Sequence, residues 1–359
     1  QSRSKESILK EVASLEGTPG YRGVIGDLGG PTANMYRMRC TKPEVEAKCR
    51  RLSCVHPTIC KLLGTDHAPT VDLLRSARSV RGVKKVNVAS GVRMDLARLS
   101  PEYLDEMAAH HVGGHLKVAP EHVSPTVLRM MKKPDVSDFD AFADAFEAAS
   151  ARAGKEQYVV PYFIASHPGS GLPEMIELAL YLKRNGYRPR QVQDFIPSPM
   201  DLATAMYHTG LDPETLKPVA VAKNIRDRRM QRALMQWFKP ENWFEAKRAL
   251  EAAGRSDLIG DGCDALIPST PPPEALGRRR AGADAAFGSY VHERGRRPED
   301  RPAGAAETKD WDAFTGYRDG EQTLPEGDGE DGTTAAPVAR SGEPRRSTGY
   351  RPFRRGARP

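Results

Sequence analysis

The run Tyr158-Val159-Val160-Pro161-Tyr162-Phe163-Ile164 has an apolar or aromatic side chain at every position. A strand with one face in water alternates apolar and polar residues, whereas a strand of a parallel sheet covered on both faces does not. Helical patterns flank this run, over residues 138–153 before it and 173–185 after it. The run therefore predicts a central strand of a parallel sheet, with helical crossovers on either side.

The same alternation of strand and helix continues in both directions from this run. Strands are predicted at Tyr21–Asp27, Lys84–Ala89, His115–Ala119, Gln157–Ala165 and Gln191–Phe195. Such an alternation is typical of an α/β fold, either a barrel or a doubly wound sheet. We favour a barrel, because every predicted strand is followed by a polar or Gly/Pro loop of similar character.

Polar residues and glycines gather in the loops that follow the predicted strands. In a parallel barrel all of these loops meet at one rim, where ligands bind. Glycines there let a ligand approach backbone N–H groups, and Arg93, Glu121 and His167 are predicted to bind its polar ends. The loops are Asp27–Thr32, Ser90–Arg93, Pro120–His122, Ser166–Gly169 and Ile196–Pro199.

The composition changes near residue 269. Residues 269–359 are dominated by Pro, Gly, Ala, Arg and acidic residues, so this tail is predicted to be disordered. Residues 201–268 are predicted to form a small helical domain that includes the basic helix face Arg226–Arg232. The formal net charge of +7 leaves two interpretations open, a nucleic-acid partner or a solubilising extension, and the charge is only a weak signal for the first.

The sequence also bears on the cellular location. No stretch approaches the ~20 apolar residues needed to cross a bilayer, and residues 1–5 lack the apolar core of a signal peptide. Clustered free cysteines without an export signal are typical of a reducing compartment. We therefore expect a cytoplasmic protein with no membrane partner.

Four of the five cysteines fall in one short segment, residues 33–64, which reads as an insertion. They are Cys40, Cys49, Cys54 and Cys60. Four thiolates are enough for a tetrahedral zinc site or an auxiliary iron–sulfur cluster, but the spacing fits neither zinc knuckles nor a ferredoxin run. The alternative is a structured insertion packed by reduced cysteines. The isolated Cys263 is expected to be a small buried residue.

A set of short runs spread over residues 1–268 carries a family resemblance. The runs are Gly23–Tyr36, Cys49–Cys54, Thr65–His67, Ala89–Arg93, His110–Gly114, Lys117–His122, Pro161–Ile164, Phe195–Pro199 and Met206–Gly210. On these residues the chain resembles the YgiQ family of radical S-adenosylmethionine proteins.

The resemblance implies a partial six-stranded β/α barrel that holds a 4Fe–4S cluster and S-adenosylmethionine. The implied enzyme cleaves this cofactor reductively to a 5′-deoxyadenosyl radical, with electrons from a donor protein such as flavodoxin or ferredoxin, and acts on an unknown substrate. The residues that the resemblance assigns to the cofactor are Gly29, Gly30, Pro31, Arg93, Glu121, His167 and Gly169.

One departure from the family pattern concerns the cluster ligands. The family's Cys-x3-Cys-x2-Cys loop has no counterpart, since the four clustered cysteines have eight, four and five residues between them. We therefore expect a fragment that begins downstream of the first strand and of the radical-cluster cysteines, with an incomplete barrel over residues 1–200. Such a fragment alone is expected to be inactive. The alternative is a metal-stabilised, basic RNA- or protein-binding module without catalysis.

Overall fold

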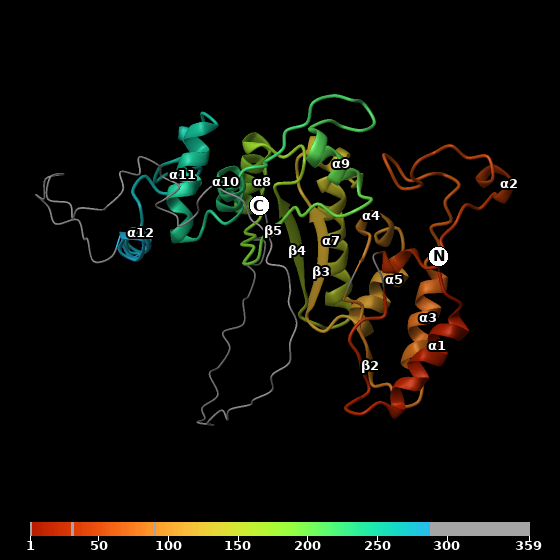
Figure 1. Ribbon diagram of the computed structural model, residues 1–359. Coiled ribbons are helices and arrows are strands. Elements are labelled where there is room, and N and C mark those ends of the chain that lie inside the picture. Colours follow the sequence, from red (N-terminus) through yellow and green to blue (C-terminus); the bar gives the residue numbers. More distant parts are fainter. Residues whose placement is uncertain (1, 30–31, 90, 288–359) are drawn as a thin grey trace, which may run out of the picture. The chain divides into compact units, whose positions relative to one another are not determined.

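The computed structural model describes residues 2–29, 32–89 and 91–287. The chain divides into two units, Gln1–Ser269 and Thr270–Pro359. In the first unit, helices alternate with short parallel strands (Figure 1). The α/β organisation expected from the sequence is therefore confirmed.

The strands of the described residues form two parallel sheets. In the first, β1 (Val24–Ile25) pairs with β2 (Lys85–Val86). In the second, β4 (Tyr158–Ala165) lies between β3 (His115–Glu121) and β5 (Gln193–Asp194). The described strands do not close into a barrel.

The helices of the first unit fill the connections between the strands and follow the last strand. The longer ones are α1 (Lys5–Ser14), α3 (Ala68–Arg78), α7 (Val136–Arg152), α8 (Leu172–Arg184), α9 (Leu202–Thr209), α10 (Ile225–Met235) and α11 (Trp243–Ala252). The shorter ones are α2 (Pro43–Glu46), α4 (Met94–Ala97), α5 (Pro101–Glu106) and α6 (Pro125–Met130), and a π-helical turn, Met107–His111, extends α5.

Helix boundaries follow local chemistry that the sequence predicted. The Ser100 side chain caps α5 by accepting a hydrogen bond from the Tyr103 N–H, and Pro101 occupies the first turn. Gly154 and Gly186 end α7 and α8 with φ of 64° and 69°, a left-handed conformation that glycine adopts easily. The predicted ends of these helices are confirmed.

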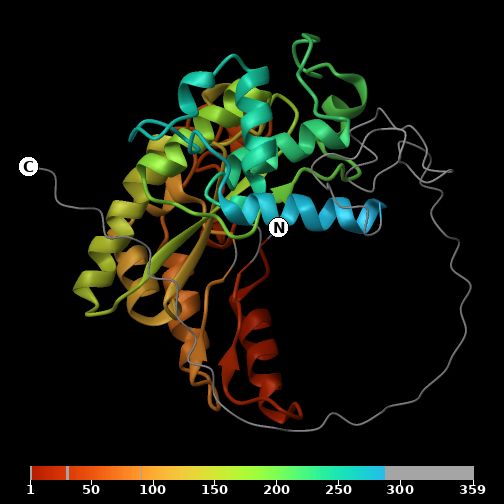
Figure 2. The same ribbon diagram turned by 90° about the vertical axis from the view of Figure 1, so that its left-hand side faces the viewer.

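The two faces of the sheet of β3, β4 and β5 are covered to different degrees. Leu116 and Phe163 are buried on the covered face, where the Phe163 ring lies 6.4 Å from that of Tyr181 on α8. Figures 1 and 2 show α7 and α8 alongside these strands. On the opposite face Lys117 is exposed and Tyr162 is half-buried. The expectation of a sheet covered on both faces was therefore wrong for the described residues, because apolar composition does not show whether a covering layer is present.

The helical domain contacts the end of the second sheet through its basic face. The Arg228 guanidinium donates to the Phe195 carbonyl at 2.8 Å, and Arg232 forms an ion pair of 3.4 Å with Asp194. At least two arginines of the basic face therefore contact the end of β5.

The described part of the second unit contains a helix, α12 (Pro273–Phe287). The composition of the sequence predicts a disordered tail over this segment, whereas residues 273–287 are helical. Pro273 at the first turn, Glu274 beside it and several Ala and Arg residues favour a helix here. The rest of the predicted tail, residues 288–359, lies outside the described residues.

Cys263 is exposed rather than buried, since it lies in the glycine-rich turn around Gly260 and Gly262. Among the residues that the structure describes, no helix has the length and apolar character to cross a membrane.

Candidate functional site

A cavity of about 270 Å³ lies beside β3 and β4, with part of its wall on their half-open face. Loops from three different places in the chain converge on it, together with side chains of β3 and β4. Its walls include Thr32, Gly91, Arg93, Lys117, Lys133 and Tyr162. This position, at the end of β2 and beside two further parallel strands, is typical of ligand sites in α/β proteins.

The loop that carries Gly29 is held beside this cavity from both sides. Before the loop, the Leu28 N–H donates to the Asn87 carbonyl at 2.8 Å. After it, the Ala33 N–H donates to the Gly91 carbonyl at 2.7 Å. These two hydrogen bonds join the loop after β1 to the loop after β2, as the prediction of converging loops requires.

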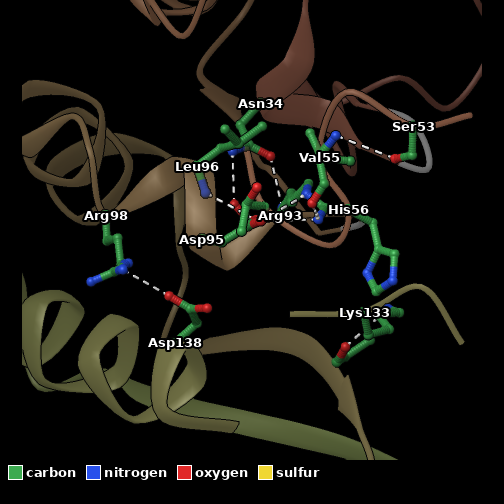
Figure 3. A network of polar contacts seen from close by, with 12 residues as sticks. Asn34, Ser53, Val55, His56, Arg93, Asp95, Leu96, Arg98, Lys133 and Asp138 are labelled. Atoms are coloured by element: carbon green, nitrogen blue, oxygen red, sulfur yellow. Dashed lines mark hydrogen bonds and ion pairs between the residues drawn. The ribbon is translucent and has the colours of Figure 1, made fainter. Parts of the chain in front are cut away.

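Arg93 is the best-anchored cation of the cavity wall (Figure 3). Its side chain donates to Asp95 Oδ2 through Nε at 3.2 Å and Nη2 at 2.9 Å, and Nη2 also donates to the Val55 carbonyl at 3.2 Å. The amide of the fully buried Asn34 accepts from the Arg93 N–H at 2.7 Å and donates to the Arg93 carbonyl at 3.0 Å. Arg93 thus connects the cysteine-containing insertion to the cavity.

Two residues at the ends of β3 and β4 adopt a backbone conformation that is rare outside glycine. Glu121, the last residue of β3, has φ of 68°, and Ser166, after β4, has φ of 63°. Such backbone strain is concentrated at functional sites. Glu121 Oε1 lies 3.5 Å from the Nζ of Lys133, which lines the cavity.

His167 and Gly169 are not among the described residues that line this cavity. The buried His167 donates from Nδ1 to the Pro168 carbonyl at 2.8 Å. Gly169 has φ of 90°, and a Cβ there would overlap the sulfur of Met130. The backbone conformation and the packing against Met130 therefore explain the glycine without a ligand. Of the other predicted cofactor residues, Gly30 and Pro31 lie outside the described residues.

A buried histidine lies next to His167. Burial, together with the charge of His167, lowers the pKa of His122 to about 3. Its Nδ1 accepts from the Ser124 N–H at 3.0 Å, so the proton resides on Nε2, which lies 3.3 Å from Ser170 Oγ. His122 is therefore a neutral hydrogen-bonding residue of the core.

The insertion brings its cysteines toward one another. Cys40 forms an antiparallel bridge with Leu63, and the Cys60 N–H donates to the Cys54 carbonyl at 2.7 Å. Burial and the thiolates of Cys60, Cys49 and Cys40 all raise the pKa of the Cys54 thiol. Within the described residues, however, no three His, Cys, Asp or Glu side chains form a ready-made metal site.

Sequence reasoning missed several residues that shape this region. Asn34 and Lys117 both fall inside motif runs, which was the signal that could have identified them. Gln231 on α10 gave no local signal. It accepts from the Ser166 N–H at 2.8 Å and donates to the Ser170 carbonyl at 2.7 Å, and so fixes the loop after β4.

These features define an α/β protein with a strand-end cavity and a cysteine-containing insertion. The chain is 50% identical to a UPF0313 protein of Rhodopseudomonas palustris over 290 residues, which cover 78% of this chain and 43% of that protein. It is 54% identical to a UPF0313 protein of Vibrio cholerae over 275 residues, 75% of this chain and 35% of that protein. It is 47% identical to the UPF0313 protein YgiQ of Escherichia coli over 286 residues, 78% of this chain and 39% of that protein.

The homologues of this chain are thus UPF0313 family proteins, YgiQ among them. The chain spans about two fifths of the length of these relatives. A second family, described as a domain of unknown function (DUF3362), matches residues 190–320. That match includes β5 and the helical domain.

Proposed function

We propose that this chain is part of a radical S-adenosylmethionine enzyme in which the strand-end cavity binds S-adenosylmethionine. The observation that carries the proposal is the convergence of the loops after β1 and β2 on one cavity beside β3 and β4. The resemblance of the motif runs of this chain to the YgiQ family of radical S-adenosylmethionine proteins supports it. In this proposal the two parallel sheets are parts of an incomplete β/α barrel, and the substrate is unknown.

The cavity lining fits the chemical groups of this cofactor. Arg93 uses Nε and Nη2 for Asp95 and Val55, and its Nη1 makes no hydrogen bond among the described residues, so it can donate to a carboxylate. Tyr162 offers an aromatic surface to a nucleobase. The loop at Gly29 would approach the methionine moiety with its backbone, and Glu121 would line the outer part of the site.

The radical chemistry would need a 4Fe–4S cluster and an electron donor such as flavodoxin or ferredoxin. In this proposal the enzyme acts in the cytoplasm. Bound together, the cluster and the cofactor would supply the chemistry that removes a hydrogen atom from the substrate. The five cysteines of this chain do not offer the Cys-x3-Cys-x2-Cys spacing. We therefore expect this chain alone to bind S-adenosylmethionine without cleaving it.

Two tyrosines on the same strand give a matched test of the binding site. Tyr162 and Tyr158 both lie on the half-open face of β4, but only Tyr162 lines the cavity. We expect Tyr162→Ala to weaken binding of S-adenosylmethionine about tenfold, because base–aromatic stacking contributes roughly 1–3 kcal/mol. Tyr158→Ala should leave the dissociation constant, measured by equilibrium dialysis, unchanged. Absence of binding by the unsubstituted chain, or equal losses in both variants, would refute the proposal.

We further propose that Cys40, Cys49, Cys54 and Cys60 bind an auxiliary iron–sulfur cluster or a zinc ion. The support is the backbone pairing of Cys40 with Leu63 and of Cys54 with Cys60, together with the burial and the three neighbouring thiols that raise the pKa of Cys54. After anaerobic reconstitution, Cys54→Ala should lose metal that the parent chain retains, and the exposed, isolated Cys263→Ala should not. Metal content and visible absorbance measure this. If Cys54→Ala keeps its metal, Cys54 is not a ligand. If the parent chain binds none, the cysteines only pack the insertion.

A further inference from the structure

A second cavity, of about 210 Å³, adjoins the first. The two cavities share Ala89 and Lys117 in their walls. The polar side chains around the second cavity are Lys85, Asn87, His111, His115 and Lys117. It lies between β2 and the beginning of β3.

Two lysines in the wall of the second cavity have no carboxylate partner among the described residues, although Glu106 lies behind His111 and Asp27 bonds the backbone of Ala89. Neither cavity has an Asp or Glu among its described lining residues. Arg93 and Lys133 in the first cavity are paired with Asp95 and Glu121. Lys85 and Lys117, by contrast, form no ion pair among the described residues. Two unpaired ammonium groups in the wall of one cavity attract an anion strongly.

The positions of these two cations are defined by the surrounding structure. The Nζ of Lys85 would lie only 3.3 Å from a Cβ built on Gly113, so the ammonium group is close to the glycine backbone in the cavity wall. The Nζ of Lys117 lies 5.9 Å from the centre of the Tyr162 ring. This cation–π contact orients Lys117 without neutralising its charge.

The second cavity also has polar groups that can form further hydrogen bonds. The Oδ1 atom of Asn87 is buried without a hydrogen-bond partner in the described structure, and such an atom requires a donor from a ligand or a water molecule. The exposed His115 supplies a ring N–H donor. A ligand with both oxygen acceptors and a hydroxyl donor would satisfy these groups.

We propose that the second cavity binds the phosphate group of a small phosphorylated molecule, with Lys85 and Lys117 as its charge partners. A phosphate matches this site better than a carboxylate does, because it carries up to two charges and three terminal oxygens for the two lysines and His115. A sugar-phosphate hydroxyl would satisfy Asn87. This inference does not rest on the binding of S-adenosylmethionine, which the proposed function assigns to the first cavity.

Calorimetric titration of the 359-residue chain tests the site. The probes are inorganic phosphate and glycerol 3-phosphate, with glycerol as the uncharged control. We expect both phosphates to bind, and Lys85→Met and Lys117→Met each to weaken binding at least tenfold. Methionine keeps the aliphatic part of the side chain, so these variants remove mainly the charge.

Lys84→Met is the matched control, because Lys84 is adjacent in sequence and exposed and lines neither cavity. It should bind phosphate as the parent chain does, and its melting temperature should match that of Lys85→Met. Lys85→Met should also keep its affinity for S-adenosylmethionine, which separates this site from the first. The proposal fails if the parent chain binds neither phosphate, if Lys84→Met loses as much affinity as Lys85→Met, or if only an RNA oligonucleotide binds.

Discussion

Gly20 and Gly23 share one backbone conformation but differ in their surroundings. Their φ angles are 83° and 82°. A Cβ on Gly20 would meet nothing within 4 Å, whereas on Gly23 it would lie 2.7 Å from the Gly82 carbonyl oxygen. The Gly23 carbonyl also accepts from the N–H groups of Lys84 and Lys85, which places β2 beside β1. Gly23 is therefore required by close packing as well as by its conformation.

Alanine substitution at both glycines separates these two effects. Gly20→Ala should lower the free energy of unfolding by about 1–2 kcal/mol, the penalty for a left-handed non-glycine residue. Gly23→Ala should lower it by a further 1–3 kcal/mol or so, because the carbonyl that blocks the Cβ is backbone and must move. Urea denaturation measures both. Equal losses in the two variants would show that the backbone around Gly82 yields easily.

Gln231 is the contact through which α10 fixes the loop after β4. Its buried side chain satisfies the Ser166 N–H and the Ser170 carbonyl. Gln236, at the end of the same helix, also bonds two carbonyls, those of Pro189 and Arg190. These carbonyls lie in a more exposed segment, where water can replace the lost side chain. The two glutamines therefore differ in burial rather than in the number of hydrogen bonds.

The pair predicts a difference in stability. Gln231→Met should lower the free energy of unfolding by about 2–4 kcal/mol, since it leaves a backbone donor and a backbone acceptor buried and unpaired. Gln236→Met should lower it by less than about 1 kcal/mol. Both values follow from the midpoints of denaturant unfolding, with the same dependence of the unfolding free energy on denaturant concentration for the two variants. Similar losses would mean that water reaches the loop after β4 as readily as it reaches Arg190.

The elements show why helices could be predicted more closely than strands. Helix ends depend on nearby residues such as Ser100 and Gly154, which are visible in the sequence. Strand ends depend on a partner. The strand predicted over Tyr21–Asp27 is only Val24–Ile25, and it begins late because Gly23 takes a left-handed conformation. The strand predicted over Lys84–Ala89 ends early, and the Val88 N–H bonds to the His111 carbonyl of the π-helical turn.

The candidate site was predictable in part, because some of its features depend on local sequence and others on tertiary contacts. Arg93 follows a strand, and its place in a glycine-containing loop indicated a site. The distinction between Arg93, which lines the cavity, and His167, which packs beside Phe195, depends on side-chain directions. Those directions are set by tertiary contacts such as the one between His167 and Phe195, whose ring centres lie 5.2 Å apart. Local sequence does not encode them.

Across the molecule, the buried histidines give the fold a common response to acid. His67, His111, His122 and His167 are all buried. Burial is the first cause that lowers the pKa of each below 6.5, and that of His122 reaches about 3. Each is therefore neutral when folded at a pH where the unfolded chain would bind a proton. The unfolded state thus binds more protons than the folded state at pH values below about 6.5.

The sign of this linkage predicts that stability is fully present above pH 6.5 and falls as the pH decreases below it. Each buried histidine contributes a slope of up to about 1.4 kcal/mol per pH unit, which for His122 extends toward pH 3. His122→Asn should reduce the slope between pH 6 and 5 by roughly that amount, whatever its effect on stability at pH 7. The exposed His208→Asn is the control for replacing a histidine at the surface. Urea denaturation at several pH values measures the slopes. A parent chain whose stability is flat from pH 7 to 5, or a His122→Asn variant with an unchanged slope, would show that the histidine core takes up protons without unfolding.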